Sequence, residues 1–223
     1  TTQGGETRPG PATLRDAQTG RAISVIANGT LPAIDAIFLD DKTIAVAWER
    51  SPTAADQRKS LPVTLHRLKD GKLLHTLLLG VDKRDSHVRL TASPKGDRIV
   101  ARFGLAGVAE VWDTKTGQRV FRVEPGFPKL TFSTPDRHTT RVTNDGAKLI
   151  LGDGGRWRVY AMADGQPLSE VRDVGFIVAT AFSPDGTRAS AAGLPIDGFY
   201  DVATGAKSIV EKLSLIHISE PTR

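Results

Sequence analysis

The chain has 223 residues, of which 39% are hydrophobic, and this is enough to bury a sizeable core in one or two domains. Lysine and arginine outnumber aspartate and glutamate by 30 to 25, and the resulting charge of +5 is scattered, which argues against a nucleic-acid partner. The absence of cysteine excludes disulfides and thiolate metal sites, and no apolar run is long enough for a transmembrane helix.

Five short polar turns that end in glycine recur along the chain. The first is LRDAQTG at Leu14–Gly20, and the best kept is VWDTKTG at Val111–Gly117. Each glycine fits the left-handed position of a tight hairpin turn, where a β-carbon would clash. Five such turns spaced 40 to 51 residues apart predict a repeated unit. The turn glycines are Gly20, Gly71, Gly117, Gly165 and Gly205.

A second series of turns alternates with the first. It comprises FLDDKTIAV from Phe38, ASPKGDRIV from Ala92, TNDGAKLIL from Thr143 and FSPDGTRAS from Phe182. Proline presets the backbone for a reverse turn, and glycine supplies the positive φ that such turns need. Short β-type runs lie between the turns. Several of them, such as TIAVAW at residues 43–48, are apolar on both faces, which predicts strands covered on both sides.

Four strands per repeat, joined by hairpins, predict an all-β chain of β-propeller blades, each a four-stranded antiparallel sheet. We expect a half-blade and four full blades, which together form an incomplete ring. Two polar segments, 49–62 and 125–137, are interpreted as surface-loop insertions, although the second could supply an extra edge strand. The half-blade covers residues 12–26, and the blades cover about 33–79, 86–124, 127–172 and 176–212.

Three of these motifs carry a family resemblance. They are AFSPDG at Ala181–Gly186, VWDTKTG at Val111–Gly117 and the weaker FYDVATG at Phe199–Gly205. In these motifs the chain resembles bacterial WD-repeat β-propellers, and the resemblance is specific for the architecture but not for a function, since propellers serve many functions. The chain lacks the Gly-His pair of that family, and with it the family's His-Ser/Thr-Asp-Trp hydrogen-bond network. Kinship to quinoprotein-like or other bacterial propellers therefore stays open.

The last eleven residues, LSLIHISEPTR at Leu213–Arg223, do not follow the repeat. They resemble a translated sequencing adapter, so we expect a non-native tail and leave it out of the fold. The half-blade and the blades would leave open strand edges, which proteins normally avoid. We therefore expect the chain to be a fragment of a larger ring of about seven or eight blades. The sequence leaves the compartment open between cytoplasm and periplasm.

No catalytic, cofactor-binding or metal-binding residue is predicted. The histidines outside the tail are His66, His75, His87 and His138, and they lack the spacing of zinc ligands. We expect His66 and His75 to be surface or cross-strand residues.

The acidic turns Asp40–Asp41 and Asp153–Gly155 are explained by turn chemistry better than by calcium. The glycine-rich GDGGRW at Gly152–Trp157 has no helix after it, so it is interpreted as a hairpin rather than a phosphate cradle.

Trp48, Trp112 and Trp157 occupy strand positions in three different blades, where packing explains them better than base stacking. We expect Arg156 and Arg158 to point to the side of their strand opposite Trp157.

The function predicted from the sequence is a scaffold that holds a protein or peptide on a propeller face, without catalysis, cofactor or metal in this segment. The alternative is part of a quinoprotein-like or hydrolase-associated propeller enzyme whose catalytic residues lie outside this segment. The oligomeric state is left open.

Overall fold

The computed structural model describes residues 12–26, 31–49, 60–80, 88–104, 107–126, 138–153, 156–171, 176–194 and 198–208. These residues form 18 β-strands, and none of them lies in a helix. Within the described residues, no helix is long and apolar enough to cross a membrane. Residues 127–137 of the insertion predicted at 125–137 and the whole predicted non-native tail, 213–223, lie outside the described residues.

The strands form five antiparallel sheets, which we number I to V in chain order. Within each sheet, successive strands pair side by side. Sheet I contains β1 (Ala12–Arg15) and β2 (Ala22–Ile26), and sheet II contains β3 (Ala33–Phe38), β4 (Thr43–Trp48), β5 (Ser60–Arg67) and β6 (Leu73–Gly80). Sheet III contains β7 (Val88–Ala92), β8 (Arg98–Phe103), β9 (Val108–Asp113) and β10 (Arg119–Val123). Sheet IV contains β11 (His138–Val142), β12 (Lys148–Asp153), β13 (Arg156–Ala161) and β14 (Pro167–Val171). Sheet V contains β15 (Phe176–Phe182), β16 (Arg188–Leu194), β17 (Gly198–Asp201) and β18 (Lys207–Ser208).

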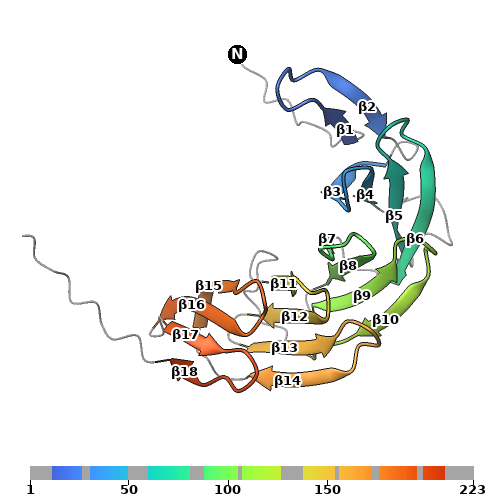
Figure 1. The fold of residues 1–223 in the computed structure, drawn as a ribbon. Coiled ribbons are helices and arrows are strands. Elements are labelled where there is room, and N and C mark those ends of the chain that lie inside the picture. Colours follow the sequence, from blue (N-terminus) through green and yellow to red (C-terminus); the bar gives the residue numbers. More distant parts are fainter. Residues whose placement is uncertain are drawn as a thin grey trace, which may run out of the picture.

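The sheets follow one another along an open arc (Figure 1). The first strands β3, β7, β11 and β15 lie on the concave side of the arc, and the last strands β6, β10, β14 and β18 lie on its convex side. Four four-stranded antiparallel sheets and one two-stranded sheet in this arrangement confirm the predicted fold class of propeller blades in an open ring.

The inner strands of sheets II and III bury both of their faces, because a sheet lies on either side of them. In β4, the side chains of Ile44, Val46 and Trp48 pack in the cluster shared with sheet I, whereas Ala45 and Ala47 pack in the cluster shared with sheet III. Similar clusters join sheet III to sheet IV and sheet IV to sheet V. Fully burying an aliphatic side chain contributes about 1.5–3 kcal/mol, so these layers between sheets are the core of the molecule.

The glycine of each turn between third and fourth strands is seated against the sheet before it. A β-carbon on Gly117 would lie 2.8 Å from Nδ1 of His75, on the last strand of sheet II. The same relation places Gly71 against Ser24, Gly165 against Phe121 and Gly205 against Val171. All of these glycines have the predicted positive φ, between 67° and 78°. Glycine is therefore required at these positions by the backbone conformation and by the neighbouring sheet.

The last strand of each of the first four sheets carries a β-bulge at the same place. Three positions after the turn glycine, one residue has no partner on the adjacent strand. The four residues are Ile23, Leu74, Val120 and Leu168. A bulge bends and twists its strand. The repeated bulges therefore give the outer edges of these sheets a common curvature.

The prediction of a surface loop at 49–62 is wrong for its last three residues, 60–62, which belong to a strand. β5 begins at Ser60, and Leu61 is buried in the core. Proline is tolerated at position 62 because the last pair between β4 and β5 is Ala47 with Val63, so no bond to β4 is lost where Pro62 lacks an N–H.

Candidate functional site

The described turns between strands gather on one face of the molecule, which we call the turn face. Each sheet of four strands contributes a turn between its first and second strands and a turn between its third and fourth strands. In an antiparallel meander these two turns lie at the same end of the sheet. Most connections of the opposite face, including 27–30, 50–59 and 81–87, lie outside the described residues, so the candidate site is built on the turn face.

The aspartates of the turn face bond mainly to their own turns. In the three turns of the form Asp-x-x-Thr-Gly, the carboxylates of Asp16, Asp113 and Asp201 accept hydrogen bonds from the backbone N–H and the hydroxyl of the threonine three residues later. These bonds to threonine hold the pKa of each of the three carboxyls below its usual range. Two further turns begin with Arg67 or Ala161 in place of the aspartate. In them the aspartate just before the glycine, Asp70 or Asp164, accepts a hydrogen bond from the backbone N–H of the residue after the glycine.

The turns between first and second strands use their carboxylates in the same way. Asp185 accepts from the hydroxyl of Ser183 at 2.6 Å and from both the backbone N–H and the hydroxyl of Thr187, which lowers its pKa to about 2. Asp40 accepts from the backbone N–H of Lys42 at 2.7 Å. Turn chemistry therefore accounts for the contacts of these carboxylates, as proposed for Asp40 from the sequence.

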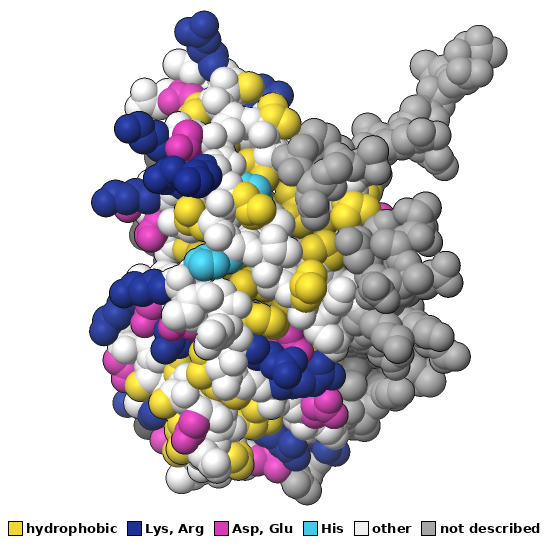
Figure 2. Space-filling model, turned by 90° about the vertical axis from the view of Figure 1, so that its right-hand side faces the viewer, with side chains coloured by type: hydrophobic (Ala, Val, Ile, Leu, Met, Phe, Trp, Pro, Cys, Tyr) yellow, Lys and Arg dark blue, Asp and Glu magenta, His cyan; other side chains and the backbone are white. Residues whose placement is uncertain are grey.

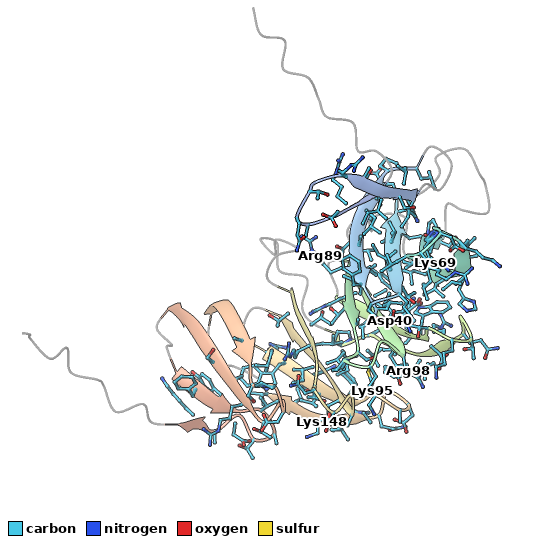
Figure 3. All side chains as sticks on the ribbon, turned by 45° about the horizontal axis from the view of Figure 1, so that its top comes forward. Asp40, Lys69, Arg89, Lys95, Arg98 and Lys148 are labelled. Atoms are coloured by element: carbon cyan, nitrogen blue, oxygen red, sulfur yellow. The ribbon has the colours of Figure 1, made fainter. Side chains whose placement is uncertain are left out.

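A groove of about 560 Å³ opens on the turn face between sheets II and III. Sheet II contributes Leu39, Asp40 and His75 to its lining, and sheet III contributes Lys95, Asp97 and Lys115. The sequence analysis did not predict this groove, because its walls come from turns far apart in the chain. Figure 3 shows Asp40, Lys95 and Lys148 in succession across three neighbouring sheets, with Lys69 further toward the convex side.

The acidic side chains of this groove make contacts within the protein that the lysines do not make. The carboxylate of Asp97 accepts from the hydroxyl of Ser93 at 2.7 Å, and Asp40 is held by its own turn. Lys95 and Lys115 form no ion pair with any residue in the described part of the chain. The lining thus carries two aspartates and two lysines, and the lysines are the charged groups without a partner among the described residues.

Partly buried ion pairs lie between the third and fourth strands of sheets III and IV. Glu110 on β9 is fully buried, and its Oε1 accepts from Arg119 at 2.9 Å and from Arg122 at 3.0 Å. Arg122 also donates to the backbone oxygen of Gly80 at 2.6 Å, which ties sheet III to the end of β6. Such a pair is costly to break because the remaining charge would stay buried without a partner.

Sheet IV contains a related arrangement. Arg158 on β13 donates to Glu170 on β14 at 2.9 Å and to the backbone oxygen of Pro125 at the end of sheet III. Trp157 faces the opposite side and packs toward sheet V, which confirms the expected orientation of Arg158. Burial raises the pKa of the Tyr160 phenol beside Arg158. These groups line a second groove, of about 620 Å³, on the convex side, but their contacts within the protein make their role structural.

The three tryptophans are buried between sheets, which confirms that they pack rather than form an exposed platform. Trp157 donates to the backbone oxygen of Val202 and contacts Phe182 and Tyr200 edge-on, with ring centroids 6.0 and 5.9 Å apart. The Nε1 of Trp112 is buried and has no hydrogen-bond partner among the described residues. The best-kept Trp-Asp motif therefore lacks the acceptor that a WD-repeat network would supply.

Of the two expectations for His66, the cross-strand position is confirmed by its pairing with Ile44 and Leu73, and the surface position is wrong. Its side chain is 6% exposed, and its Nε2 lies 2.8 Å from the hydroxyl of Thr64, which accepts from Trp48 at 2.6 Å. The other ring nitrogen lies 3.1 Å from the backbone oxygen of Gly71, which can only accept. Nδ1 therefore donates to this oxygen, while Nε2 contacts the Thr64 hydroxyl. No sequence signal marked this network, because its members come from two strands.

The other histidines do not meet in a common site within the described residues. His75 lies on β6 against Gly117 and lines the turn-face groove. His138 lies at the start of β11, and His87 falls outside the described residues. No group of three or more His, Asp or Glu side chains with metal-binding geometry occurs in the described part of the chain. The prediction that the segment has no catalytic or metal site stays a prediction.

Comparison with known proteins identifies the fold and no closer relationship. No protein-family model matches the chain, and no curated protein matches its sequence. Among solved structures 632 chains match, and one of them is described as the crystal structure of a mitotic checkpoint complex. That chain is 13% identical, with a TM-score of 0.61 over 90% of the present chain. The present chain spans 58% of its length. At this identity the similarity supports a WD-repeat-like β-propeller fold.

Proposed function

We propose that this chain is an interaction module that binds an extended, acidic segment of another protein in the turn-face groove between sheets II and III. The proposal is supported chiefly by the groove itself, whose two aspartates are engaged within the protein while Lys95 and Lys115 are available to a ligand. Its volume of about 560 Å³ matches that of pockets that hold a few side chains.

The positions of the groove's residues favour an extended ligand. The lining includes Leu39 at the turn between β3 and β4, which is buried, and Leu74 on the bulge of β6, which is exposed. A bound segment could therefore place an apolar side chain against Leu74 and a carboxylate between the lysines. Because the sheets are packed over a common core, the groove is held open before binding, and little ordering entropy is lost by the protein.

Selection of peptides from a random displayed library tests this function. We expect enrichment of sequences with Asp or Glu, and binding that weakens with rising salt. The double substitution Lys95→Glu and Lys115→Glu should weaken binding of the selected peptides by at least about ten-fold. The matched control is Lys69→Glu with Lys72→Glu, which makes the same charge change outside the groove. Failure to select acidic peptides, or equal loss in both variants, would contradict the proposal.

A further inference from the structure

β6 is the longest of the outer strands and, unlike β10 and β14, carries no charge. Its eight residues, LLHTLLLG, leave Leu73 50% exposed and Leu78 55% exposed. Figure 2 views the molecule from the side on which β6 lies in Figure 1, and shows hydrophobic side chains gathered over the middle of this surface. Charged side chains lie along the left margin of the same view and below the hydrophobic region.

The pairing of β6 with β5 fixes which backbone groups face outward. The backbone N–H of Arg67 donates to the oxygen of Lys72, so Arg67 directs its polar groups toward β6. Alternation along β5 then assigns the same direction to Val63 and Leu65. Their partners are Leu77 and His75, so these residues use their backbone groups within the sheet.

Thr76 and Leu78 consequently direct their N–H and C=O groups toward the free edge of sheet II. Pro62 agrees with this assignment, because its partner is Leu78 and a pair that contains proline cannot exchange two hydrogen bonds. The free stretch is bounded by the bulge at Leu74 and by Gly80, whose oxygen is occupied by Arg122.

The corresponding edges of sheets III and IV are protected by charge. Arg122 occupies in β10 the position that Thr76 has in β6, and Glu124 follows where Leu78 stands. Glu170 occupies the position of Thr76 in β14. Charged residues on an edge strand discourage pairing with another chain, whereas an uncharged apolar edge favours it.

We propose that two copies of this chain associate through β6, paired antiparallel about a two-fold axis at Leu77. In this register Thr76 of each copy lies opposite Leu78 of the other, and about four hydrogen bonds join the two edges. Lys69 and Lys72 of the two copies lie at opposite ends of the pair, so like charges do not face one another. β6 lies on the convex side of the arc, where two molecules can approach edge to edge (Figure 1).

Sedimentation velocity of the full chain over a wide range of concentrations tests the proposal. We expect a monomer–dimer equilibrium that Leu78→Lys weakens by at least about ten-fold. Thr76→Pro should abolish the dimer, because it removes an outward N–H while leaving the ladder to β5 intact. The matched controls are Thr76→Val and Leu168→Lys, which places the same charge on an equally exposed leucine of sheet IV. A monomer at all concentrations, or a dimer that survives both test substitutions, would overturn the proposal.

Cross-linking tests the register, because the chain contains no cysteine. Mild oxidation of a mixture of the Thr76→Cys and Leu78→Cys proteins should yield a disulfide-linked dimer, since opposed residues in such a pair have Cα atoms about 5.5 Å apart. Leu168→Cys serves as the collision control. Equal cross-linking of that control would overturn the assigned pairing.

Discussion

Glu110 and Arg158 occupy equivalent positions on the third strands of neighbouring sheets, with opposite charges. Each faces an oppositely charged residue on the fourth strand, since Glu110 pairs in register with Arg122 and Arg158 with Glu170. In both sheets the arginine also donates to a backbone oxygen at the end of the preceding sheet. The hydrogen bond from an arginine to the preceding sheet therefore comes from the fourth strand in sheet III and from the third strand in sheet IV.

Exchange of the charges in sheet III should therefore be tolerated better than either single change. Glu110→Arg alone places a third cation beside Arg119 and Arg122 at a buried position and should lower the free energy of unfolding by about 3–5 kcal/mol. Adding Arg122→Glu should restore at least about 1–2 kcal/mol, because the exchanged pair reproduces the arrangement of sheet IV. Denaturant unfolding of both single variants and the double variant measures this coupling, and additive losses would contradict it.

The seated turns predict unequal costs for the same glycine substitution. Gly165→Ala adds a β-carbon 2.5 Å from the Phe121 ring at a φ of 78°, and should lower the free energy of unfolding by about 2–4 kcal/mol. Gly20 has a similar φ but nothing within 4 Å of its added carbon, so Gly20→Ala should cost about 1 kcal/mol. Thermal and denaturant unfolding distinguish the two, and equal losses would show that the neighbouring sheet does not matter.

Two tryptophans should respond differently to loss of the indole nitrogen. Trp48→Phe breaks the hydrogen bond to Thr64 in a buried network, whereas Trp112→Phe removes a buried N–H that has no partner among the described residues. We expect Trp48→Phe to cost about 1–2 kcal/mol more in unfolding free energy than Trp112→Phe. A larger loss for Trp112→Phe would imply an acceptor for its Nε1.

The turn of Asp185 should depend on pH in a defined window. Its pKa is lowered to about 2 from an ordinary 3.8, so the ionised carboxylate contributes stability that is fully present above pH 3.8 and is lost as the pH falls through about 2. Ser183→Ala removes the first cause of this shift and should raise the pKa of Asp185 toward its ordinary value. Titration of the carboxyl carbon resonance by NMR measures the change, and an unaltered midpoint would contradict it.

Local patterns in the sequence were sufficient to predict the fold. Turn glycines such as Gly117 and the doubly apolar run at 43–48 report backbone conformation and burial directly, and both were confirmed. These signals depend on neighbours a few residues away, so one sequence carries them.

The polar contacts were not predictable in the same way. The sequence shows Glu110 only as a charged residue within a strand. His66 was expected to be a surface or cross-strand residue. Neither residue type indicates which side chains it contacts. Those partners depend on register, which the sequence pattern leaves open to within a residue or two. The groove between sheets II and III was missed for a related reason, since its walls are brought together by stacking of turns.

The seating of each turn on the sheet before it also bears on how such a chain could grow. His75, Phe121 and Val171 each receive the turn of the following sheet, although their side chains share little beyond their place on the last strand. If one sheet were duplicated and inserted between two others, its turn would pack on the last strand of the preceding sheet. Its own last strand would receive the turn of the following sheet. Tandem duplication could thus add sheets to the array while using the same kind of contact between sheets. Each copy could then diverge in its exposed residues alone.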